Sequence, residues 1–247
     1  MYDITDLDNF YRSARGRKLA AQLAQDIAGL WQPSRSASQL AVGYPFMFLP
    51  EDQLPPVLMP TPPGALVWPA SKGVISALTA PHSWPVASDQ TDFLLITHAL
   101  EFAPDPAQFM AEAARVLSGS GQLLVMIPNR NSRWVASRGP FGQGQPYSRG
   151  QITRLLDGAG LKVTAVNRSL LLPPIAGLAS ESGLGRAARR LGRMLGGVLL
   201  VQATKMVYVK KKRKSAAMLG PLAPNMVRPL SGQGLHSQTR LQTAKDE

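Results

Sequence analysis

The chain of 247 residues contains no cysteine, which excludes disulfides, zinc–thiolate sites and thiol catalysis. It also lacks any apolar run close to the roughly 20 residues that a membrane-spanning helix needs. Its opening residues, MYDITDLDNF, are acidic and lack the basic and then apolar order of a secretory signal. These absences favour a cytoplasmic protein, and the length suits one α/β domain with extensions.

Acidic residues are scarce only near the C-terminal end. Residues 1–180 carry 14 Lys and Arg against 12 Asp and Glu, whereas residues 181–247 carry 13 against 3. The formal net charge of +12 therefore says little about the ligand of the domain itself. Arginines at 186, 189, 190 and 193 should lie on one side of a surface helix, with membrane-surface or nucleic-acid contact as alternatives.

Residues 210–247 have no apolar periodicity and are rich in Lys, Pro, Gly, Ser and Gln, so they are predicted to be disordered. This segment has no aromatic residue to stack on bases. We therefore expect no specific nucleic-acid recognition, only weak contact with anionic surfaces. The expected organisation is an N-terminal helix and linker (1–38), a domain (39–209) with an Arg-rich helical insertion at about 180–197, and the basic tail (210–247).

Strand-like and helix-like segments alternate along the domain, which predicts an open, mostly parallel sheet. Asp105 and Pro106 have the cap and first-turn positions of a helix, and Ser148 and Gln151 have capping-box spacing. Ligands of such sheets bind beyond the carboxyl ends of the strands. We expect helices over 6–30 and 71–78 and within 104–121 and 148–160, and strands over 39–43, 65–68, 92–100, 122–128, 161–174 and 197–210.

The middle of the chain resembles the class I S-adenosylmethionine-dependent methyltransferases, and more closely their type 11 domain. The similarity is carried by Leu100–Glu101 after a buried strand, by Asp105–Pro106, by the helix end Arg115–Leu117 and by Gly121. It implies a Rossmann-like fold with a seven-stranded, mostly parallel sheet, helices on both faces and an antiparallel last strand. It also implies S-adenosylmethionine as cofactor and methyl transfer to an acceptor that the sequence does not identify, for which we expect a small molecule.

Residues 127–151 (IPNRNSRWVASRGPFGQGQPYSRGQ) are similar to a bacterial subgroup of methyltransferase-like proteins. That subgroup has Gly-Tyr, here Gly43–Tyr44, in place of a glycine-rich cofactor loop. Only one glycine then allows close backbone approach to a ligand. The expected second strand also ends without the carboxylate that usually holds the ribose. Losing such a hydrogen bond costs roughly 1.5–3 kcal/mol, so cofactor binding is expected to be about tenfold to a hundredfold weaker, or lost.

Candidate site residues follow the strands of the expected sheet. Gly43, Tyr44, Trp68, Trp84 and His98 are the candidates for cofactor contact, the aromatic ones by stacking or else as core residues.

His98 and Asn129 are the candidates for catalysis, with His98 as a base or a structural histidine, and Glu101 is expected to fix the turn. Asn129, Arg130, Trp134 and Tyr147 are the substrate-side candidates, in or beside a segment that is either a lid or an ordered loop.

Neither His82 nor His236 has metal-ligand spacing, so no metal site is predicted. The sequence leaves open an active methyltransferase, an inactive protein of the same fold that serves as a binding partner, and a binder of anionic surfaces. It does not identify the acceptor or the oligomeric state.

Overall fold

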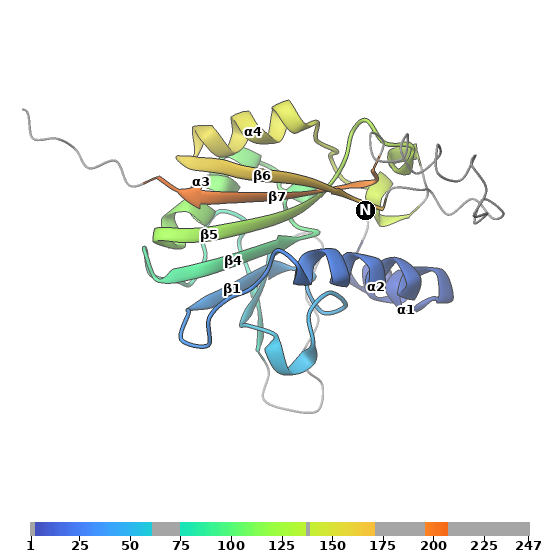
Figure 1. Ribbon diagram of the computed structural model, residues 1–247, viewed down its shortest axis with the longest axis horizontal. Helices are drawn as coiled ribbons and strands as arrows, with labels where there is room; N and C mark the ends of the chain where they lie inside the picture. The colour runs from blue at the N-terminus through green and yellow to red at the C-terminus, as the bar shows by residue number, and fades with distance from the viewer. Residues whose placement is uncertain (1–2, 61–74, 137–138, 171–195, 207–247) are drawn as a thin grey trace, which may run out of the picture. The chain divides into compact units, whose positions relative to one another are not determined.

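A seven-stranded sheet organises the part of the chain that the computed structural model describes, residues 3–60, 75–136, 139–170 and 196–206. The strand order is β3-β2-β1-β4-β5-β7-β6 (Figure 1). The pairs from β3 to β5 are parallel, and β7 runs antiparallel to both β5 and β6. The strands are β1 Gln39–Gly43, β2 Val57–Pro60, β3 Ser76–Thr79, β4 Thr91–Thr97, β5 Leu117–Pro128, β6 Leu161–Ser169 and β7 Val198–Lys205. This topology confirms the predicted fold class.

Helices cover both faces of the sheet, and each face has its own apolar cluster (Figure 1). Leu40, Val42 and Ile96 lie in the cluster with α3 and α4, while Ala41 and Leu95 lie in the cluster with α1 and α2. This division follows from the alternation of side chains along a strand. The helices are α1 Ile4–Arg12, α2 Ala14–Ala28, α3 Pro106–Val116 and α4 Arg149–Gly158, and the short 3-10 helices are η1 Glu51–Gln53, η2 Leu100–Phe102, η3 Arg133–Ala136 and η4 Pro140–Gly142.

The predicted helix caps are present. The Asp105 carboxylate accepts hydrogen bonds from the amides of Ala107 and Gln108, at 2.9 and 3.0 Å, and Pro106 is the first residue of α3. Ser148 and Gln151 form the reciprocal capping box of α4. Capping of this kind satisfies amides that a helix start would otherwise leave without a partner.

The predicted single helix over residues 6–30 is wrong, because the chain breaks at Ser13. The Ser13 amide closes α1 on the Phe10 carbonyl, and its hydroxyl accepts a hydrogen bond from the Gly16 amide at 3.0 Å to start α2. A side chain at Gly16 would overlap the Phe10 carbonyl oxygen. The apolar spacing continues through the break, so periodicity alone did not reveal two helices.

Two predictions between β1 and β4 are also wrong. The second strand is β2, Val57–Pro60, inside the segment that its prolines had marked as a loop. Pro60 is the last residue of β2, where its missing amide donor is tolerated. Residues 76–78 belong to strand β3, not to a helix. The expected strand 65–68 lies outside the described residues.

The two N-terminal helices pack directly on the sheet. Leu7 of α1 and Leu23 of α2 are fully buried in the cluster that also contains Leu95 of β4. The described residues, from 3 to 206, accordingly belong to one compact unit. The expected Arg-rich insertion and basic tail lie outside the described residues. No helix in the described ranges combines the length and the apolar character needed to cross a membrane.

Candidate functional site

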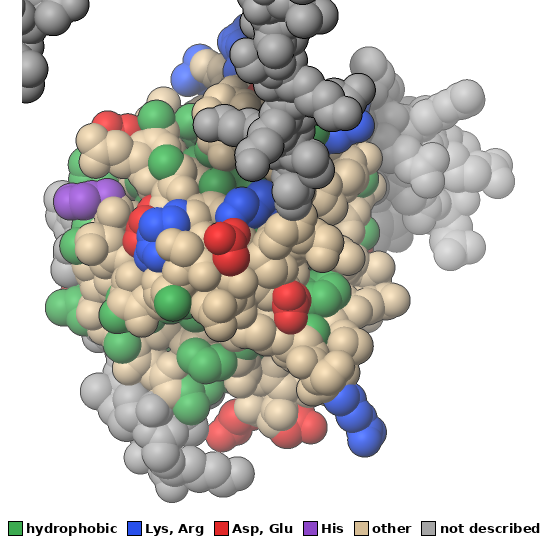
Figure 2. All heavy atoms as spheres, turned by 90° about the vertical axis from the view of Figure 1, so that its left-hand side faces the viewer, with side chains coloured by type: hydrophobic (Ala, Val, Ile, Leu, Met, Phe, Trp, Pro, Cys, Tyr) green, Lys and Arg blue, Asp and Glu red, His purple; other side chains and the backbone are tan. Residues whose placement is uncertain are grey.

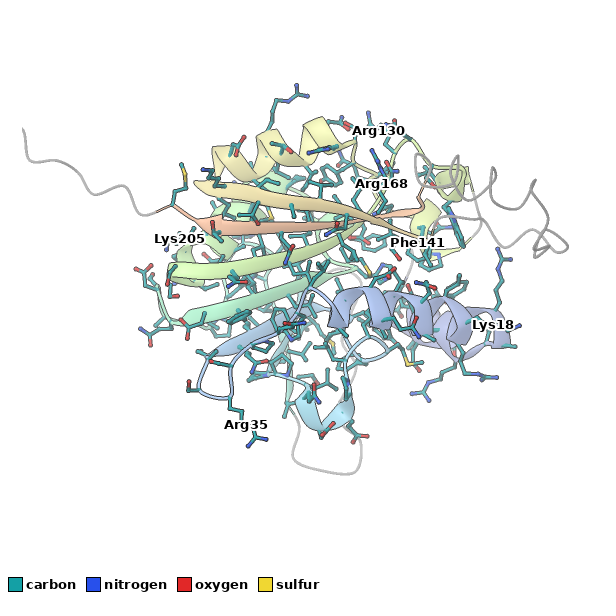
Figure 3. All side chains as sticks on the ribbon, in the orientation of Figure 1. Lys18, Arg35, Arg130, Phe141, Arg168 and Lys205 are labelled. Atoms are coloured by element: carbon teal, nitrogen blue, oxygen red, sulfur yellow. The ribbon has the colours of Figure 1, made fainter. Side chains whose placement is uncertain are left out.

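The candidate site lies where β1 and β4 end side by side. Gly43 pairs with Thr97 in the sheet, and His98 follows directly. Figure 3 shows Phe141, whose ring centroid lies 5.6 Å from that of His98, at the same end of the sheet as Arg130 and opposite Lys205. This is the carboxyl edge of the parallel strands, the predicted location for a ligand.

Gly43 is needed for packing between the strands. Its φ angle is +97°, a conformation that side-chain-bearing residues rarely adopt. A Cβ atom there would overlap the Thr97 carbonyl oxygen and lie 2.9 Å from the Ala99 Cβ. The open side of this glycine is therefore filled by β4 and its following turn rather than facing a ligand.

Tyr44 is fully buried, and its hydroxyl donates a 2.8 Å hydrogen bond to the Asp8 carboxylate of α1. Asp8 also binds the Arg12 guanidinium at 2.5 Å. Burial raises the pKa of the Tyr44 phenol, and the hydrogen bond to Asp8 raises it further. The loop after β1 is thus fastened to the N-terminal helix.

His98 is the centre of a buried polar chain. Its Nε2 lies 2.7 Å from the Tyr11 hydroxyl and its Nδ1 lies 3.0 Å from Glu101 Oε1. In the neutral tautomer that satisfies both contacts, Nδ1–H donates to Glu101 and Nε2 accepts from Tyr11. His98 and Glu101 are 2% and 3% exposed, and Tyr11 is fully buried. These two hydrogen bonds connect α1, the end of β4 and η2.

Aromatic rings surround the hydrogen-bonded residues Tyr11, His98 and Glu101. The Tyr11 and Tyr44 rings stack with centroids 5.8 Å apart and planes 13° from parallel. Phe48 meets Tyr11 edge-on at 5.2 Å, and Phe141 tilts against His98 at 5.6 Å. We call Tyr11, Tyr44, Phe48, His98 and Phe141 the ring cluster. Offset stacks and edge contacts at these separations are favourable.

The segment from Pro140 to Tyr147 wraps Glu101, as an ordered connection would. The Gln145 amide donates to the Glu101 carbonyl at 2.8 Å, and a Cβ at Gly144 would come within 2.6 Å of the Glu101 Cγ. Tyr147 is 5% exposed, and its hydroxyl has no hydrogen-bond partner among the described residues. The segment therefore packs against Glu101, whose main-chain carbonyl binds Gln145 and whose carboxylate contacts His98.

Alkaline pH should destabilise the protein through this segment. Burial, and then the negative charge of Glu101, raise the pKa of Tyr147 from 10.0 to about 12. The protonated phenol is thus favoured in the folded state, so its contribution is complete below about pH 10 and is lost as the pH rises through 12. We expect the urea concentration at the unfolding midpoint, measured from pH 8 to 11.5, to fall with pH above 10. The fall should be less steep in Tyr147→Phe than in the wild type. Equal slopes for the two proteins would contradict this assignment.

Of the other residues predicted for catalysis or substrate contact, Trp134 touches the ring cluster, whereas Asn129 and Arg130 form hydrogen bonds with residues outside it. Asn129 donates through Nδ2 to the Gly196 carbonyl at 2.7 Å and accepts from the Asn131 amide at 3.2 Å, so it holds its loop. Arg130 is exposed, with Nε 3.4 Å from the Pro146 carbonyl. Trp134 is buried edge-on to Phe141 at 5.7 Å.

Of the two tryptophans proposed for cofactor stacking, the structure describes Trp84, which lies away from the ring cluster. Trp84 packs edge-on against Phe109 of α3 at 5.4 Å, in the apolar cluster on the opposite face of the sheet from Tyr44. Its amide donates to the Glu112 carboxylate at 2.7 Å. This placement agrees with the core alternative for Trp84. Trp68 lies outside the described residues.

Sequence reasoning did not identify Tyr11, Phe48 and Phe141 as neighbours of His98. Tyr11 comes from a helix 87 residues earlier in the chain, which no local pattern connects to β4. The one available signal is the apolar stripe of α1, in which Ile4, Leu7 and Tyr11 recur at helical spacing. An apolar stripe of this kind predicts that the helix packs on another element. In the structure α1 packs at the carboxyl edge of the parallel strands.

The loop after β1 is where a nucleoside cofactor would lie in this fold. The Tyr44 amide is bonded to the Thr97 carbonyl at 2.8 Å, and the Phe48 amide to the Pro45 carbonyl at 2.9 Å. The sequence has no Asp or Glu from residue 53 to residue 88, so no carboxylate follows β2 or β3 closely. With α1 in place, the described residues after β1 do not fit this group.

Comparison with known proteins supports the resemblance predicted from the sequence. The model of the methyltransferase domain family matches residues 70–125, which include all the motifs that carried it. No match was found among curated protein sequences.

Solved structures share the fold at low sequence identity. A Thermotoga maritima S-adenosylmethionine-dependent methyltransferase, described as a possible histamine N-methyltransferase, is 18% identical with a TM-score of 0.63, over 82% of this chain and 96% of that one. A Haloferax volcanii complex contains the Trm112 methyltransferase activator and a putative methyltransferase. The match to this structure has 16% sequence identity and a TM-score of 0.59, and it covers 83% of this chain and 97% of that one.

Geranyl diphosphate C-methyltransferase from Streptomyces coelicolor, in complex with S-adenosyl-L-homocysteine, gives 16% identity and a TM-score of 0.53, over 78% of this chain and 83% of that one. At these identities the likeness shows the fold. The described chain therefore has the architecture of the class I methyltransferases.

Proposed function

From the class I methyltransferase fold of this chain, we propose that it is an S-adenosylmethionine-dependent methyltransferase that acts on a small-molecule acceptor and opens by withdrawal of α1. The observation that carries the proposal is the buried His98–Glu101 pair at the carboxyl edge of β4, covered by α1. The family match over residues 70–125 and the cofactor product bound in the Streptomyces neighbour support the choice of cofactor.

The chemistry that this chain's own residues supply is proton handling and orientation. His98 Nε2 accepts a hydrogen bond, and Glu101 holds the ring so that this nitrogen points at the Tyr11 hydroxyl. A histidine whose Nε2 is an acceptor can take a proton from a bound hydroxyl group. The cofactor, when bound, supplies an electrophilic methyl group. We assign the proton-accepting role to His98 and a positioning role to Glu101.

A second candidate is a protein of this fold that has lost catalysis and acts as a binding partner. Two observations favour it: the ring cluster occupies the carboxyl edge, and no acidic residue follows β2 in the sequence up to residue 88. A fold alone does not establish activity, so binding must separate the two candidates.

Calorimetric titration with S-adenosyl-L-homocysteine tests the proposed function. We expect saturable binding to the wild type and at least tenfold tighter binding to Tyr11→Ala, because the substitution removes the side chain that ties α1 to His98. Ile27→Ala, at a fully buried position of α2, is the control for a general loss of packing and should bind like the wild type. No heat of binding in any of the three at millimolar ligand would support the non-catalytic candidate.

The acceptor and the compartment belong to the proposal as well. The two neighbours whose names give an acceptor concern histamine and geranyl diphosphate, which are both small molecules. The face in Figure 2 carries acidic and basic side chains next to each other, with hydrophobic ones scattered among them. This face is at the Lys205 end of the sheet, opposite the candidate site. The proposal of a small acceptor therefore rests on the neighbours, and the bacterial cytoplasm is the expected location. Among the described residues, no group of three or more His, Asp and Glu is placed to hold a metal ion.

A further inference from the structure

We infer that the Tyr11 phenol holds the place of the acceptor, and that the site takes a small phenol or another flat ring bearing a hydroxyl group. As a statement about the methyl acceptor, this inference rests on the proposed function. As a statement about a binding site, it rests on the contacts of Tyr11 alone.

The polar end of the site is arranged for a hydroxyl group. The Tyr11 oxygen lies 2.7 Å from His98 Nε2, a normal length for a hydrogen bond from a phenol. Glu101 Oε1, 3.0 Å from Nδ1, orders the imidazole so that Nε2 is the acceptor. A ligand that presents a hydroxyl at this point could replace the Tyr11 phenol without changing any other hydrogen bond of the pair.

The apolar end of the site is a slot for one ring. Tyr44 lies parallel to the Tyr11 ring at 5.8 Å, and Phe48 meets it edge-on at 5.2 Å. Both Tyr44 and Phe48 are at least 98% buried, so packing holds the walls in position. A slot with one parallel and one perpendicular wall selects a flat occupant.

The polar groups beside this ring slot exceed what packing alone requires. A buried His–Glu pair is costly, and apolar side chains of the same volume often serve a core equally well. Oxygen atoms Glu101 Oε2 and Thr97 Oγ1 are buried without a partner among the described residues. His98 also has a positive φ of 49°, which is uncommon for a residue with a side chain. Strained backbone and unsatisfied polar atoms concentrate at functional sites.

The side chain that fills the ring slot belongs to a short helix at the N-terminal end of the described chain. Tyr11 lies in the last turn of α1, a helix of nine residues. Helices this short are not stable alone in water, so α1 depends on its docking. Its contacts with the rest of the domain include the Tyr11–His98 and Asp8–Tyr44 hydrogen bonds and the burial of Ile4 and Leu7. Entry of an external phenol then competes with docking of α1.

The test uses p-cresol, which is the tyrosine side chain as a free molecule, and toluene, which lacks the hydroxyl. In Tyr11→Ala, calorimetry should give saturable p-cresol binding at least tenfold tighter than toluene binding. Adding His98→Leu to this variant should abolish the preference. Ile27→Ala, whose cavity lies in the same apolar cluster and leaves Tyr11 in place, should show no preference for p-cresol.

A second measurement uses the wild type and does not depend on the folding of Tyr11→Ala. Millimolar p-cresol should speed hydrogen exchange of the amides in residues 4–12, because it displaces α1, and equal toluene should not. Equal binding of p-cresol and toluene in Tyr11→Ala, or unchanged exchange in the wild type, would overturn the inference. The p-cresol titrations contain no cofactor, so they are independent of the titration with S-adenosyl-L-homocysteine. If p-cresol binds and S-adenosyl-L-homocysteine does not, the proposed methyltransferase activity is wrong and the phenol-binding site stands. The reverse result would keep the enzyme and remove the phenol as its acceptor.

Discussion

Replacing Gly43 with alanine should lower the free energy of unfolding by roughly 2–6 kcal/mol. About 1–3 kcal/mol comes from the strained backbone and about 1–3 kcal/mol from crowding. The φ angle of +97° disfavours any side chain, and the new Cβ would overlap the Thr97 carbonyl oxygen. Both atoms belong to paired strands, so neither can move without disturbing the sheet. Domains of this size have roughly 5–15 kcal/mol in total, so much of the stability is at risk.

Gly158→Ala provides the matched control for this prediction. Gly158 is the last residue of α4, and a Cβ there would meet no atom within 4 Å. Alanine in a helix is favoured over glycine by about 0.5–1 kcal/mol, so this variant should be as stable as the wild type or more so. Urea unfolding followed by far-ultraviolet circular dichroism measures both changes. A cost below about 1 kcal/mol for Gly43→Ala would show that the β1–β4 contact is not as tight as described.

The second large effect is expected at Glu101. Glu101→Ala should cost roughly 1–3 kcal/mol, the range found when a buried donor is left without its acceptor. The substitution leaves the His98 Nδ1–H without its acceptor and removes the side chain that contacts Gly144. Glu101→Gln keeps an oxygen within reach of Nδ1 and nearly the same volume. It should therefore lose less than half as much stability.

The two Glu101 variants also separate a structural role from a positioning role. If Glu101 only fills space, Gln should restore every property of the wild type. If it sets the tautomer of His98, the nitrogen chemical shifts of the imidazole should differ between the wild type and Glu101→Gln, because a neutral amide does not favour Nδ1–H as a carboxylate does. Identical histidine spectra in the two proteins would remove the positioning role.

The fold was predictable from the sequence because its signals are local. The buried runs at β4 and β5, the Asp105–Pro106 start of α3 and the capping box of α4 each identify an element within a few residues. Errors arose where two local rules disagreed. The prolines around Val57–Pro60 suggested a loop. The same residues are also compatible with a short strand that ends at a proline, which is what the structure has. Ser13 caps a helix inside a stripe that continues across it.

The candidate site was predictable only in part. His98 and Tyr44 were identified because both follow strands whose ends must meet at one edge of the sheet. The expectation that Gly43 faces a ligand came from the resemblance, and the geometry instead gives its open side to the Thr97 carbonyl. Tyr11 could not be predicted, because its partner is decided by how α1 docks. That docking depends on the whole apolar surface of the sheet rather than on any spacing within α1.

The placement of β7 between β5 and β6 has a consequence for synthesis on the ribosome. Residues 198–205 are translated after every other described strand. They nevertheless pair with residues 122–128 of β5 on one side and with β6 on the other. Until they emerge, a nascent chain presents the bare edge of β5, and unpaired edges of this kind promote aggregation. Premature termination before Val198 would therefore yield an insoluble fragment, even though the strands from β1 to β5 are complete by then.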